Sequence, residues 1–255
     1  MKTVICGKGG SGKSTITALL AKKMASRGRR VLVIDTDESN LGLHRQLGLA
    51  SPEDFMGYIG GKKAFMQQMM KKMPKGEPLT LFEDSWSVAD VPEQYISKKD
   101  GIGLIAIGKI HEFGEGCACP MGALSRNLID RIGPDDADCI LIDTEAGIEH
   151  FGRGIERGCD LILAVLEPSY ESILLCSQIE EMGRAIGKPV HFILNKIDDE
   201  NRETLSRAID SALIAGYIPR SSDIARACLK GSEMDLDLPA IGEIADFIET
   251  TSGSA

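Results

Sequence analysis

A glycine-rich segment near the start of the chain constrains its fold more than any other feature. Residues 7 to 14 read Gly-Lys-Gly-Gly-Ser-Gly-Lys-Ser and follow a short apolar run, Met1 to Ile5. Residues Thr15 to Lys23 have the apolar spacing of a helix. A strand, a glycine-rich loop and a helix in this order form the context in which the motif G-x-x-x-x-G-K-[ST] binds nucleotide phosphates. We therefore expect a phosphate-binding loop within an α/β fold.

The residues of this loop have separate expected roles. Glycines lack a Cβ, so the backbone can turn successive N–H groups toward one anion. The N-terminus of the following helix adds its partial positive charge at the same place. We expect Lys13 to reach the β- and γ-phosphates and the Ser14 hydroxyl to bind Mg²⁺. The predicted nucleotide-binding residues of the loop are Gly7, Gly9, Gly10, Ser11, Gly12, Lys13, Ser14 and Thr15.

A second lysine, Lys8, lies inside the loop, where it is not needed to hold phosphates in its own chain. The pattern K-G-G-x-G-K-[ST] resembles the signature of the "deviant" phosphate-loop ATPases, a class that includes MinD and ParA ATPases and nitrogenase iron protein. This resemblance implies that Lys8 crosses a dimer interface and neutralises transition-state charge on the partner's nucleotide. An arginine finger acts in the same way.

Two aspartates, Asp35 and Asp37, end the predicted buried strand Val31 to Ile34. Ligands of open α/β sheets bind beyond the carboxyl ends of the strands, which gives these side chains an expected role. We expect Asp35 to hold an Mg²⁺-bound water or the Ser14 hydroxyl. In the deviant class the aspartate at the position of Asp37 orients the attacking water. The alternative for such a carboxylate is to cap the next helix.

Two switch segments follow from the same reasoning. The first is Glu38 to Gly48, with Asn40 as a further polar contact. The second follows the predicted strand Cys139 to Ile142, which ends in the pattern D-x-x-x-G. In this pattern Asp143 is expected to hold Mg²⁺ through a water, and the N–H of Gly147 to sense the γ-phosphate.

A pair of cysteines, Cys117 and Cys119, precedes a predicted helix and follows the predicted strand Ile102 to Ile107. The pair supplies two thiolates and leaves two positions of a tetrahedral metal site open. A two-fold axis through this loop would bring two pairs together as four thiolates. Such ligands suit Zn²⁺, Ni²⁺, Cu⁺ or an Fe–S cluster, so the metal stays open. His111 and Glu112 are possible outer ligands, although a solvated loop is the favoured interpretation for both.

The base-binding residues are predicted near the C-terminal third of the chain. Another strand runs into Asn195-Lys196-Ile197-Asp198. The sequence N-K-x-D reads guanine in GTPases, whereas in the deviant class the asparagine at this place contacts adenine. The lysine inside the phosphate loop favours ATP, and GTP remains the alternative. Asn195 and Lys196, together with Pro219 and Arg220 in a later loop, are the predicted residues near the base.

Composition limits what the chain can be. A chain of 255 residues with 43% hydrophobic content suits one phosphate-loop ATPase domain over residues 1–255. A net charge of −9 disfavours nonspecific nucleic-acid binding. The longest apolar stretch, Leu161 to Leu166, is far too short to span a membrane. We see no secretion signal and expect seven reduced cysteines in the cytoplasm.

The fold class that we predict is α/β, with a mostly parallel central sheet and helices on both faces. Further predicted strands are Leu161 to Leu166, Val190 to Leu194 and Ala215 to Ile218, and further helices are Ser172 to Gly183, Arg202 to Leu213 and Ile241 to Ile248. The cysteines predicted as small core residues are Cys6, Cys139, Cys159, Cys176 and Cys228.

Residues 52 to 100 resemble a fixed core least. Five of the ten methionines lie here, and a helix with a Met-rich side is predicted from Ala64 to Met73. Methionine is adaptable and is over-used on surfaces that repack, so partner docking is one interpretation. Core filling is the favoured one.

Taken together, the motifs G-K-G-G-S-G-K-S, D-T-D, C-A-C, D-x-x-x-G and N-K resemble the CooC-type ATPases of carbon monoxide dehydrogenase maturation and their acetyl-CoA synthase counterpart. The segment Glu145 to His150 with Arg153-Gly154, and the pair Glu167-Pro168, are similar to that family. The resemblance implies a homodimer that binds nickel at a shared Cys117/Cys119 site, with Zn²⁺ as a substitute in vitro. ATP binding would close the dimer, and hydrolysis would help to load nickel into the client's Fe–S cluster.

Three other interpretations remain. A MinD-like positioning ATPase needs a basic amphipathic helix at its C-terminus for membranes, and a partition ATPase needs a basic surface for DNA. The last predicted helix instead carries Glu243, Asp246 and Glu249. An iron protein-like ATPase with a bridging [4Fe–4S] cluster takes its cysteines from separated positions, unlike this adjacent pair. A nickel-delivering GTPase is the third. We expect neither a nucleic acid nor a membrane as partner.

Overall fold

The computed structural model describes residues 1–72, 81–82, 84–110, 119–133, 139–148, 151 and 153–252, with the side chains of Lys72, Cys119 and Ser252 excepted. The predictions for His111, Glu112 and Cys117 lie outside the described residues. For Cys119 only the backbone is described, as the first residue of a helix.

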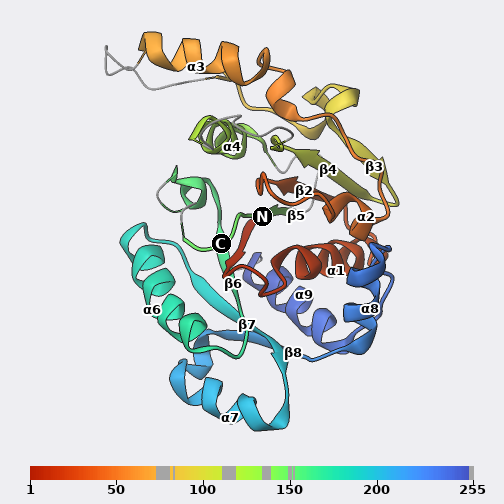
Figure 1. Ribbon diagram of the computed structural model, residues 1–255, viewed down its shortest axis with the longest axis vertical. Helices are drawn as coiled ribbons and strands as arrows, with labels where there is room; N and C mark the ends of the chain where they lie inside the picture. The colour runs from red at the N-terminus through yellow and green to blue at the C-terminus, as the bar shows by residue number, and fades with distance from the viewer. Residues whose placement is uncertain are drawn as a thin grey trace.

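An eight-stranded sheet forms the centre of the molecule, in the order β3-β4-β2-β5-β1-β6-β7-β8 (Figure 1). Its neighbouring strands pair in parallel, except β3 and β4, which are antiparallel. The strands are β1 (Lys2–Gly7), β2 (Val31–Asp35), β3 (Ser97–Lys99), β4 (Ile102–Ala106), β5 (Cys139–Asp143), β6 (Leu161–Leu166), β7 (Val190–Ile197) and β8 (Ile214–Pro219).

Helices cover both faces of this sheet (Figure 1). The α-helices are α1 (Lys13–Ser26), α2 (Leu43–Leu47), α3 (Gly61–Lys72), α4 (Cys119–Arg131), α6 (Tyr170–Ala185), α7 (Asp199–Ala208), α8 (Ser222–Lys230) and α9 (Pro239–Ser252). One core lies between the sheet and α1, α2, α8 and α9. The other lies between the sheet and α3, α4, α6 and α7, with α3 outermost, over α4.

The central strands contribute side chains to both cores. Val4 and Cys6 of β1 face one core and Ile5 faces the other, and all three are 0% exposed. Because both faces are covered, the strands read as continuous apolar runs rather than as alternating ones. The predicted α/β architecture, with a mostly parallel sheet between two helical layers, is confirmed.

The sequence analysis was wrong about four local features. It did not predict β3, whose residues Ser97–Lys99 form an exposed edge, or the helix α8. The predicted helix Arg202 to Leu213 ends at Ala208, because Ile209 is extended and a short 3-10 turn, η6 (Ser211–Leu213), follows. Cys228 on α8 is exposed, contrary to its predicted place in the core.

Residues 52 to 100, which resembled a fixed core least, contain an aromatic cluster around the buried Phe55. Phe55 stacks on Tyr58 and packs edge-on against Trp86 and Tyr95, and Phe82 joins the same group. Further short turns here are η1 (Phe55–Gly57), η3 (Val88–Asp90) and η4 (Glu93–Tyr95). The aromatic residues lie singly between turn residues, so no periodic pattern marks them in the sequence.

The helix α3 provides a direct test of how this region is held. Phe65 is 0% exposed within the second core, whereas its neighbour Met66 is 42% exposed. Phe65→Ala should therefore lower the free energy of unfolding by about 3–5 kcal/mol, because it leaves a cavity. Met66→Ala should change it by less than about 0.5 kcal/mol, because Met66 is not part of that core. Urea unfolding of both variants measures the difference, and equal effects would contradict this account of the packing.

Candidate functional site

The phosphate loop connects β1 to α1 and needs glycine at particular positions. Gly7, Gly10 and Gly12 have φ values of 139°, 79° and 101°, a region that other residues rarely adopt. A side chain at position 7 would also collide with the carbonyl oxygen of Val165 on β6. A Cβ at position 12 would lie 2.5 Å from Asn195 Nδ2. The loop is therefore pressed against the neighbouring strands, and its glycines are structural requirements.

The start of α1 presents backbone N–H groups without intrahelical partners. Gly12 precedes the helix in the left-handed region, and no side chain of the described residues caps it. Such N–H groups, with the helix dipole behind them, form an anion site. Lys13 Nζ lies 3.3 Å from the carbonyl oxygen of Lys8, so the lysine folds back over the loop. These features fit the phosphates of a nucleotide.

The end of β7 holds the loop from the other side. Asn195 Nδ2 donates to the carbonyl oxygen of Ser11 at 2.7 Å, and Lys196 Nζ donates to that of Gly10 at 2.6 Å. Lys196 has a positive φ of 59° and also pairs with Glu167 at 2.8 Å. The N–H of Ser11 donates within the loop, to the carbonyl oxygen of Lys8 at 3.2 Å. The peptide group held at the Ser11 carbonyl turns the N–H of Gly12 away from β7, toward the ligand side. The sequence placed both residues near the base; their contacts here are with the phosphate loop.

A compact oxygen cluster lies beside the loop. Ser14 Oγ donates to Asp143 Oδ2 at 2.6 Å, and Asn40 Nδ2 donates to Ser14 Oγ at 2.8 Å. Thr17 Oγ1 lies 3.2 Å from Asp143 Oδ1. Burial raises the pKa of Asp143 to about 6, although the hydrogen bond from Ser14 lowers it. A hydroxyl and a carboxylate oxygen in contact are a donor set that suits Mg²⁺, so the residues present fit that ion.

Asp35 is held differently from what the sequence suggested. The Ser14 hydroxyl donates to Asp143, and Asp35 instead forms an ion pair with Lys109, Nζ to Oδ2, at 2.6 Å. Asp35 and Asp143 lie directly opposite each other on β2 and β5. Burial raises the pKa of Asp35 to about 7, Lys109 opposes that rise, and the Asp143 carboxylate adds to it.

Lys109 is the functional residue that the sequence analysis missed. It follows β4 at the same edge of the sheet, and its Nζ also donates to the carbonyl oxygen of Asp37 at 2.6 Å. The next residue, Ile110, donates its N–H to the carbonyl oxygen of Glu38 at 3.2 Å. The sequence could have indicated Lys109, because it closely follows a buried strand and the carboxyl ends of parallel strands converge at the ligand site. These contacts tie the first switch to the segment that runs toward Cys117.

Three other predicted residues make contacts that differ from their expected roles. The Asp37 carboxylate accepts from Ser39 N at 2.9 Å and from Ser39 Oγ at 2.6 Å. The N–H of Gly147 donates to the carbonyl oxygen of Gly7 at 3.0 Å. Lys8 Nζ lies 3.5 Å from Glu171, within its own chain. Water orientation, phosphate sensing and a role across an interface therefore stay predictions for these residues.

An arginine connects the two switches. Arg153 lies 2.8 Å from Glu145 of the second switch and 3.9 Å from Glu38 of the first. The sequence analysis included Arg153 only as part of a resemblance. One guanidinium therefore contacts both predicted switch segments.

The residues predicted to lie near the base are at the ends of β7 and β8. Pro219 ends β8, and Arg220 donates its N–H to the carbonyl oxygen of Ile197 at 3.0 Å. The Asp198 carboxylate accepts the N–H of Asn201 at 3.0 Å and so caps α7. No contact of Pro219 or Arg220 with a base is part of the structure, so their assignment stays a prediction.

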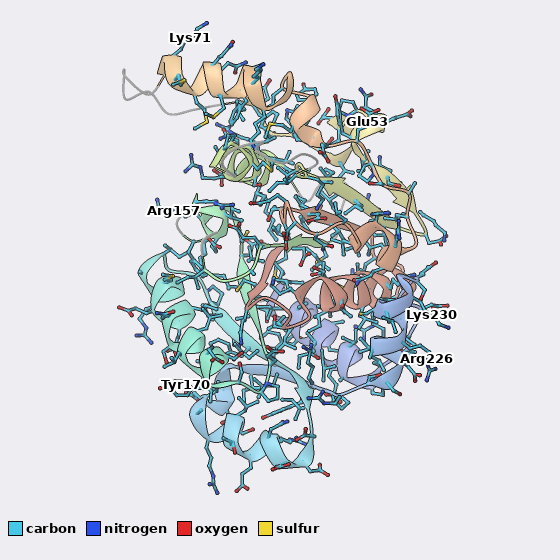
Figure 2. The ribbon with its side chains drawn as sticks, in the orientation of Figure 1. Glu53, Lys71, Arg157, Tyr170, Arg226 and Lys230 are labelled. Carbon is cyan, nitrogen blue, oxygen red and sulfur yellow. The ribbon has the colours of Figure 1, made fainter. Side chains whose placement is uncertain are left out.

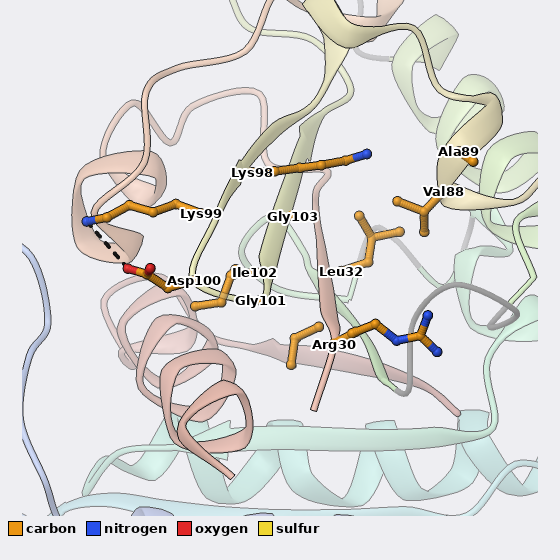
Figure 3. A pocket seen from close by; sticks show the side chains of 11 residues that line it. Arg30, Leu32, Val88, Ala89, Lys98, Lys99, Asp100, Gly101, Ile102 and Gly103 are labelled. Atoms are coloured by element: carbon orange, nitrogen blue, oxygen red, sulfur yellow. Dashed lines mark ion pairs between the residues drawn. The ribbon is translucent and has the colours of Figure 1, made fainter. Parts of the chain in front are cut away.

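A cavity of about 420 Å³ lies away from this site (Figure 3). It is lined by the first residues of β2 and β4, including Val31 and Ile102, and by Lys98. The phosphate loop lies at the opposite, carboxyl ends of the strands. Nucleotides of open α/β sheets bind at the carboxyl ends, so this cavity is not the nucleotide site.

Within the described part of the chain, no group of three or more His, Cys, Asp or Glu side chains is arranged to hold a metal ion. In that same part, no helix is both long enough and apolar enough to cross a bilayer.

The hold of Asn195 on the phosphate loop is testable. Asn195→Ala removes the 2.7 Å hydrogen bond to Ser11 and frees the loop from β7. One such hydrogen bond contributes about 1–1.5 kcal/mol, so the dissociation constant for Mg-ADP should rise roughly tenfold. Isothermal titration calorimetry measures it. Asn201→Ala, which only loosens the start of α7, is the matched control. An unchanged dissociation constant for Asn195→Ala would show that Asn195 does not support nucleotide binding.

Comparison with known proteins agrees with this geometry. An uncharacterized ATP-binding protein of Methanocaldococcus jannaschii is 49% identical over 248 residues, which cover 97% of this chain and 99% of the relative. The carbon monoxide dehydrogenase accessory protein CooC of Rhodospirillum rubrum is 36% identical over 232 residues, covering 89% of this chain and 86% of CooC.

Among solved structures, the MinD cell division protein of Aquifex aeolicus superposes with a TM-score of 0.67 at 22% identity, covering 100% of this chain and 97% of that one. This likeness concerns the fold. The family described as CobQ/CobB/MinD/ParA nucleotide binding domain matches residues 2–234. The chain therefore belongs to the CobQ/CobB/MinD/ParA family of nucleotide-binding domains.

Proposed function

We propose that this protein is a dimeric ATPase that binds nickel at Cys117 and Cys119 and inserts it into the Fe–S cluster of carbon monoxide dehydrogenase or acetyl-CoA synthase. The observation that carries the proposal is the contact of Lys109 with Asp35, which joins the nucleotide edge to the segment leading to the two cysteines. The 36% identity to CooC supports the choice of client. Nickel is the cargo of this reaction.

The residues of the loop perform the nucleotide chemistry in this proposal. The N–H groups of the loop and of the start of α1 bind the phosphates, and Lys13 contacts the β- and γ-phosphates. Ser14 and, through a water, Asp143 would hold Mg²⁺, which supplies charge neutralisation when bound. Asp37 orients the attacking water. A relative from Pyrococcus horikoshii is described as MinD complexed with Mg-ADP, which supports this ligand pair.

Lys8 acts on the nucleotide of the partner in this proposal and must leave its present contacts to do so. It lies 3.5 Å from Glu171 and 3.8 Å from Glu167, and its side chain is 38% exposed. Exposed ion pairs contribute about 0–1 kcal/mol, so exchanging them for a triphosphate costs little. In the single chain, Lys8 stays paired with Glu167 and Glu171, and it exchanges these partners for the nucleotide when a second copy binds.

The structural role of Asp198 favours ATP over GTP as the bound nucleotide. In a GTPase the aspartate of N-K-x-D bonds the guanine base. Here an oxygen of the Asp198 carboxylate accepts the N–H of Asn201 and caps α7. The side chain is therefore already engaged in a structural role, which supports adenine as the base.

Coupling between nucleotide and metal follows the contacts of Lys109. The first switch responds to the nucleotide, and its Asp37 and Glu38 carbonyls accept hydrogen bonds from Lys109 and Ile110. When the switch moves, these contacts move Lys109 and Ile110, which precede Cys117 in the sequence. On a two-fold axis this changes the distance between the two pairs of thiolates, and with it the affinity for the metal.

A positioning or partition ATPase is less well supported. The similarity to MinD structures is at 17–22% identity, and that to a plasmid partition protein of Borrelia burgdorferi is at 16%; both concern the fold alone. The last helix, α9, has no basic residue in its last turn, unlike a helix that binds membranes. An Fe–S cluster like that of the iron protein would use the same cysteines. Elemental analysis, described below, distinguishes such a cluster from bound nickel.

The trans role of Lys8 predicts complementation between two inactive variants. Lys8→Gln and Asp37→Asn should each bind Mg-ATP but hydrolyse it far more slowly. In a mixed dimer, one site combines an intact Asp37 with the partner's Lys8. An equimolar mixture should therefore regain about a quarter of the wild-type ATPase rate, since half of the dimers are mixed and one of their two sites is complete. A mixture as inactive as its components would show that Lys8 acts in its own chain.

The metal site predicts one nickel ion per two chains, with an affinity that depends on the nucleotide. Ni²⁺ titrations of nucleotide-free, ADP-bound and ATP-analogue-bound protein should give different dissociation constants. Cys117→Ala/Cys119→Ala should lose the metal and dimerise less, yet still bind nucleotide. Cys228→Ala, at an exposed cysteine outside the pair, is the control and should keep the metal.

Elemental analysis after anaerobic purification, together with the absorbance near 400 nm, separates nickel from an Fe–S cluster. Activation of nickel-free carbon monoxide dehydrogenase by the loaded protein and ATP then tests the delivery step. Identical nickel affinity in all three nucleotide states, or unchanged metal in the double variant, would overturn the proposal.

A further inference from the structure

We propose that the outer side of α3 is the docking surface for an acidic protein partner, namely the enzyme that receives the metal; the identity of this partner rests on the proposed function. The surface consists of Lys63, Met66, Gln67, Met70 and Lys71, and we call it the α3 surface. These residues are exposed and recur at the spacing of one helical face.

The arrangement of the α3 surface is apolar at its centre and basic at its ends. Met66 is 42% exposed and Met70 is 68% exposed, one helical turn apart. Lys63 precedes this pair and Lys71 follows it, both exposed. Figure 2 shows Lys71 directed away from the body of the protein, at the end of the molecule that α3 forms. Two adaptable methionines between two cations are suited to an apolar spot ringed by carboxylates.

The opposite side of α3 is fixed, so the surface is preformed. Phe65 is 0% exposed, and Met69 packs against the same core. The helix contacts α4 and the turn η1. A rigid surface loses little conformational entropy on binding, which favours a specific partner over a loose association. The methionines of α3 are thus divided between the core, where Met69 packs, and the exposed side, where Met66 and Met70 lie.

Charge favours an acidic partner. The twelve residues of α3 contain no Asp or Glu, whereas the whole chain carries a net charge of −9. A basic surface on an acidic protein orients an acidic partner toward itself and repels that partner elsewhere.

A membrane is a poorer fit for the same residues. Interfacial helices insert a broad apolar face rich in Trp, Phe or Leu. The exposed apolar residues of α3 are the two methionines Met66 and Met70, since its aromatic residue, Phe65, is buried in the core. A protein surface needs only a small apolar centre of this size.

The position of α3 supports the link to metal delivery. It packs on α4, and α4 begins at Cys119 (Figure 1). A partner docked on α3 is therefore held next to the helix that starts at the predicted metal-binding pair.

The test uses the full-length protein and purified nickel-free carbon monoxide dehydrogenase as the probe. Two variants alter the α3 surface: Lys63→Glu/Lys71→Glu and Met66→Ser/Met70→Ser. Arg207→Glu/Lys230→Glu changes the net charge equally at exposed residues of α7 and α8 and is the matched control. ATPase rate, nickel stoichiometry and the urea unfolding midpoint are measured for each protein first, so that a folding defect is recognised.

We expect both α3 variants to bind the probe roughly tenfold or more weakly than the wild type, with ATPase rate and nickel content unchanged. The control should bind as the wild type does. The affinity of the wild type should fall with added salt, and that of Lys63→Glu/Lys71→Glu should not. Flotation with vesicles of phosphatidylglycerol and phosphatidylethanolamine should leave all the proteins unbound.

The outcomes separate the two proposals. If wild-type protein binds the probe and activates it, and the α3 variants do so equally well, the docking proposal is overturned while the proposed function stands. If wild-type protein neither binds nor activates the probe, the proposed function fails and the identity of the partner fails with it. Flotation that depends on Met66 and Met70 would assign the surface to a membrane and overturn the docking proposal.

Discussion

The contact between the phosphate loop and the ends of β6 and β7 is the constraint on which the site depends. The backbone at Gly7 passes so close to the Val165 carbonyl that a side chain does not fit. Asn195 and Lys196 then hold the carbonyls of Ser11 and Gly10. The N–H of Ser11 is used within the loop by the carbonyl oxygen of Lys8. The peptide group held at the Ser11 carbonyl has its N–H, that of Gly12, turned the opposite way, toward the side where an anion can bind.

Two buried aspartates on adjacent strands create the second constraint. Asp35 and Asp143 are in register on β2 and β5, and both have raised pKa values because they are buried. Two carboxylates so close in a region of low dielectric need compensating partners. Ser14 bonds one of them and Lys109 pairs with the other. The cation that stabilises the strand end belongs to the segment leading to Cys117, so stability and the proposed coupling share one interaction.

The region between the first switch and β4 serves a different purpose from the sheet. Its aromatic cluster around Phe55 and Trp86 fixes α3 over α4 at the edge of the molecule. Phe65 and Met69 face inward, while Met66 and Met70 face outward. The same residue type therefore fills a core on one side of a helix and forms an exposed surface on the other. The sequence interpretation that favoured core filling holds for Met56 and Met69 and fails for Met66 and Met70, while Met73 lies outside the described residues.

The sequence by itself determined the parallel sheet, the phosphate loop and the aspartates at the strand ends, because these depend on local backbone geometry and on continuous apolar runs. Only the tertiary structure decided which carboxylate meets Ser14, that Lys109 pairs with Asp35, and that Cys228 is exposed. Such pairings join residues far apart in the chain, and their energies depend on burial and distance. Neither quantity is encoded in the spacing of residues along one segment.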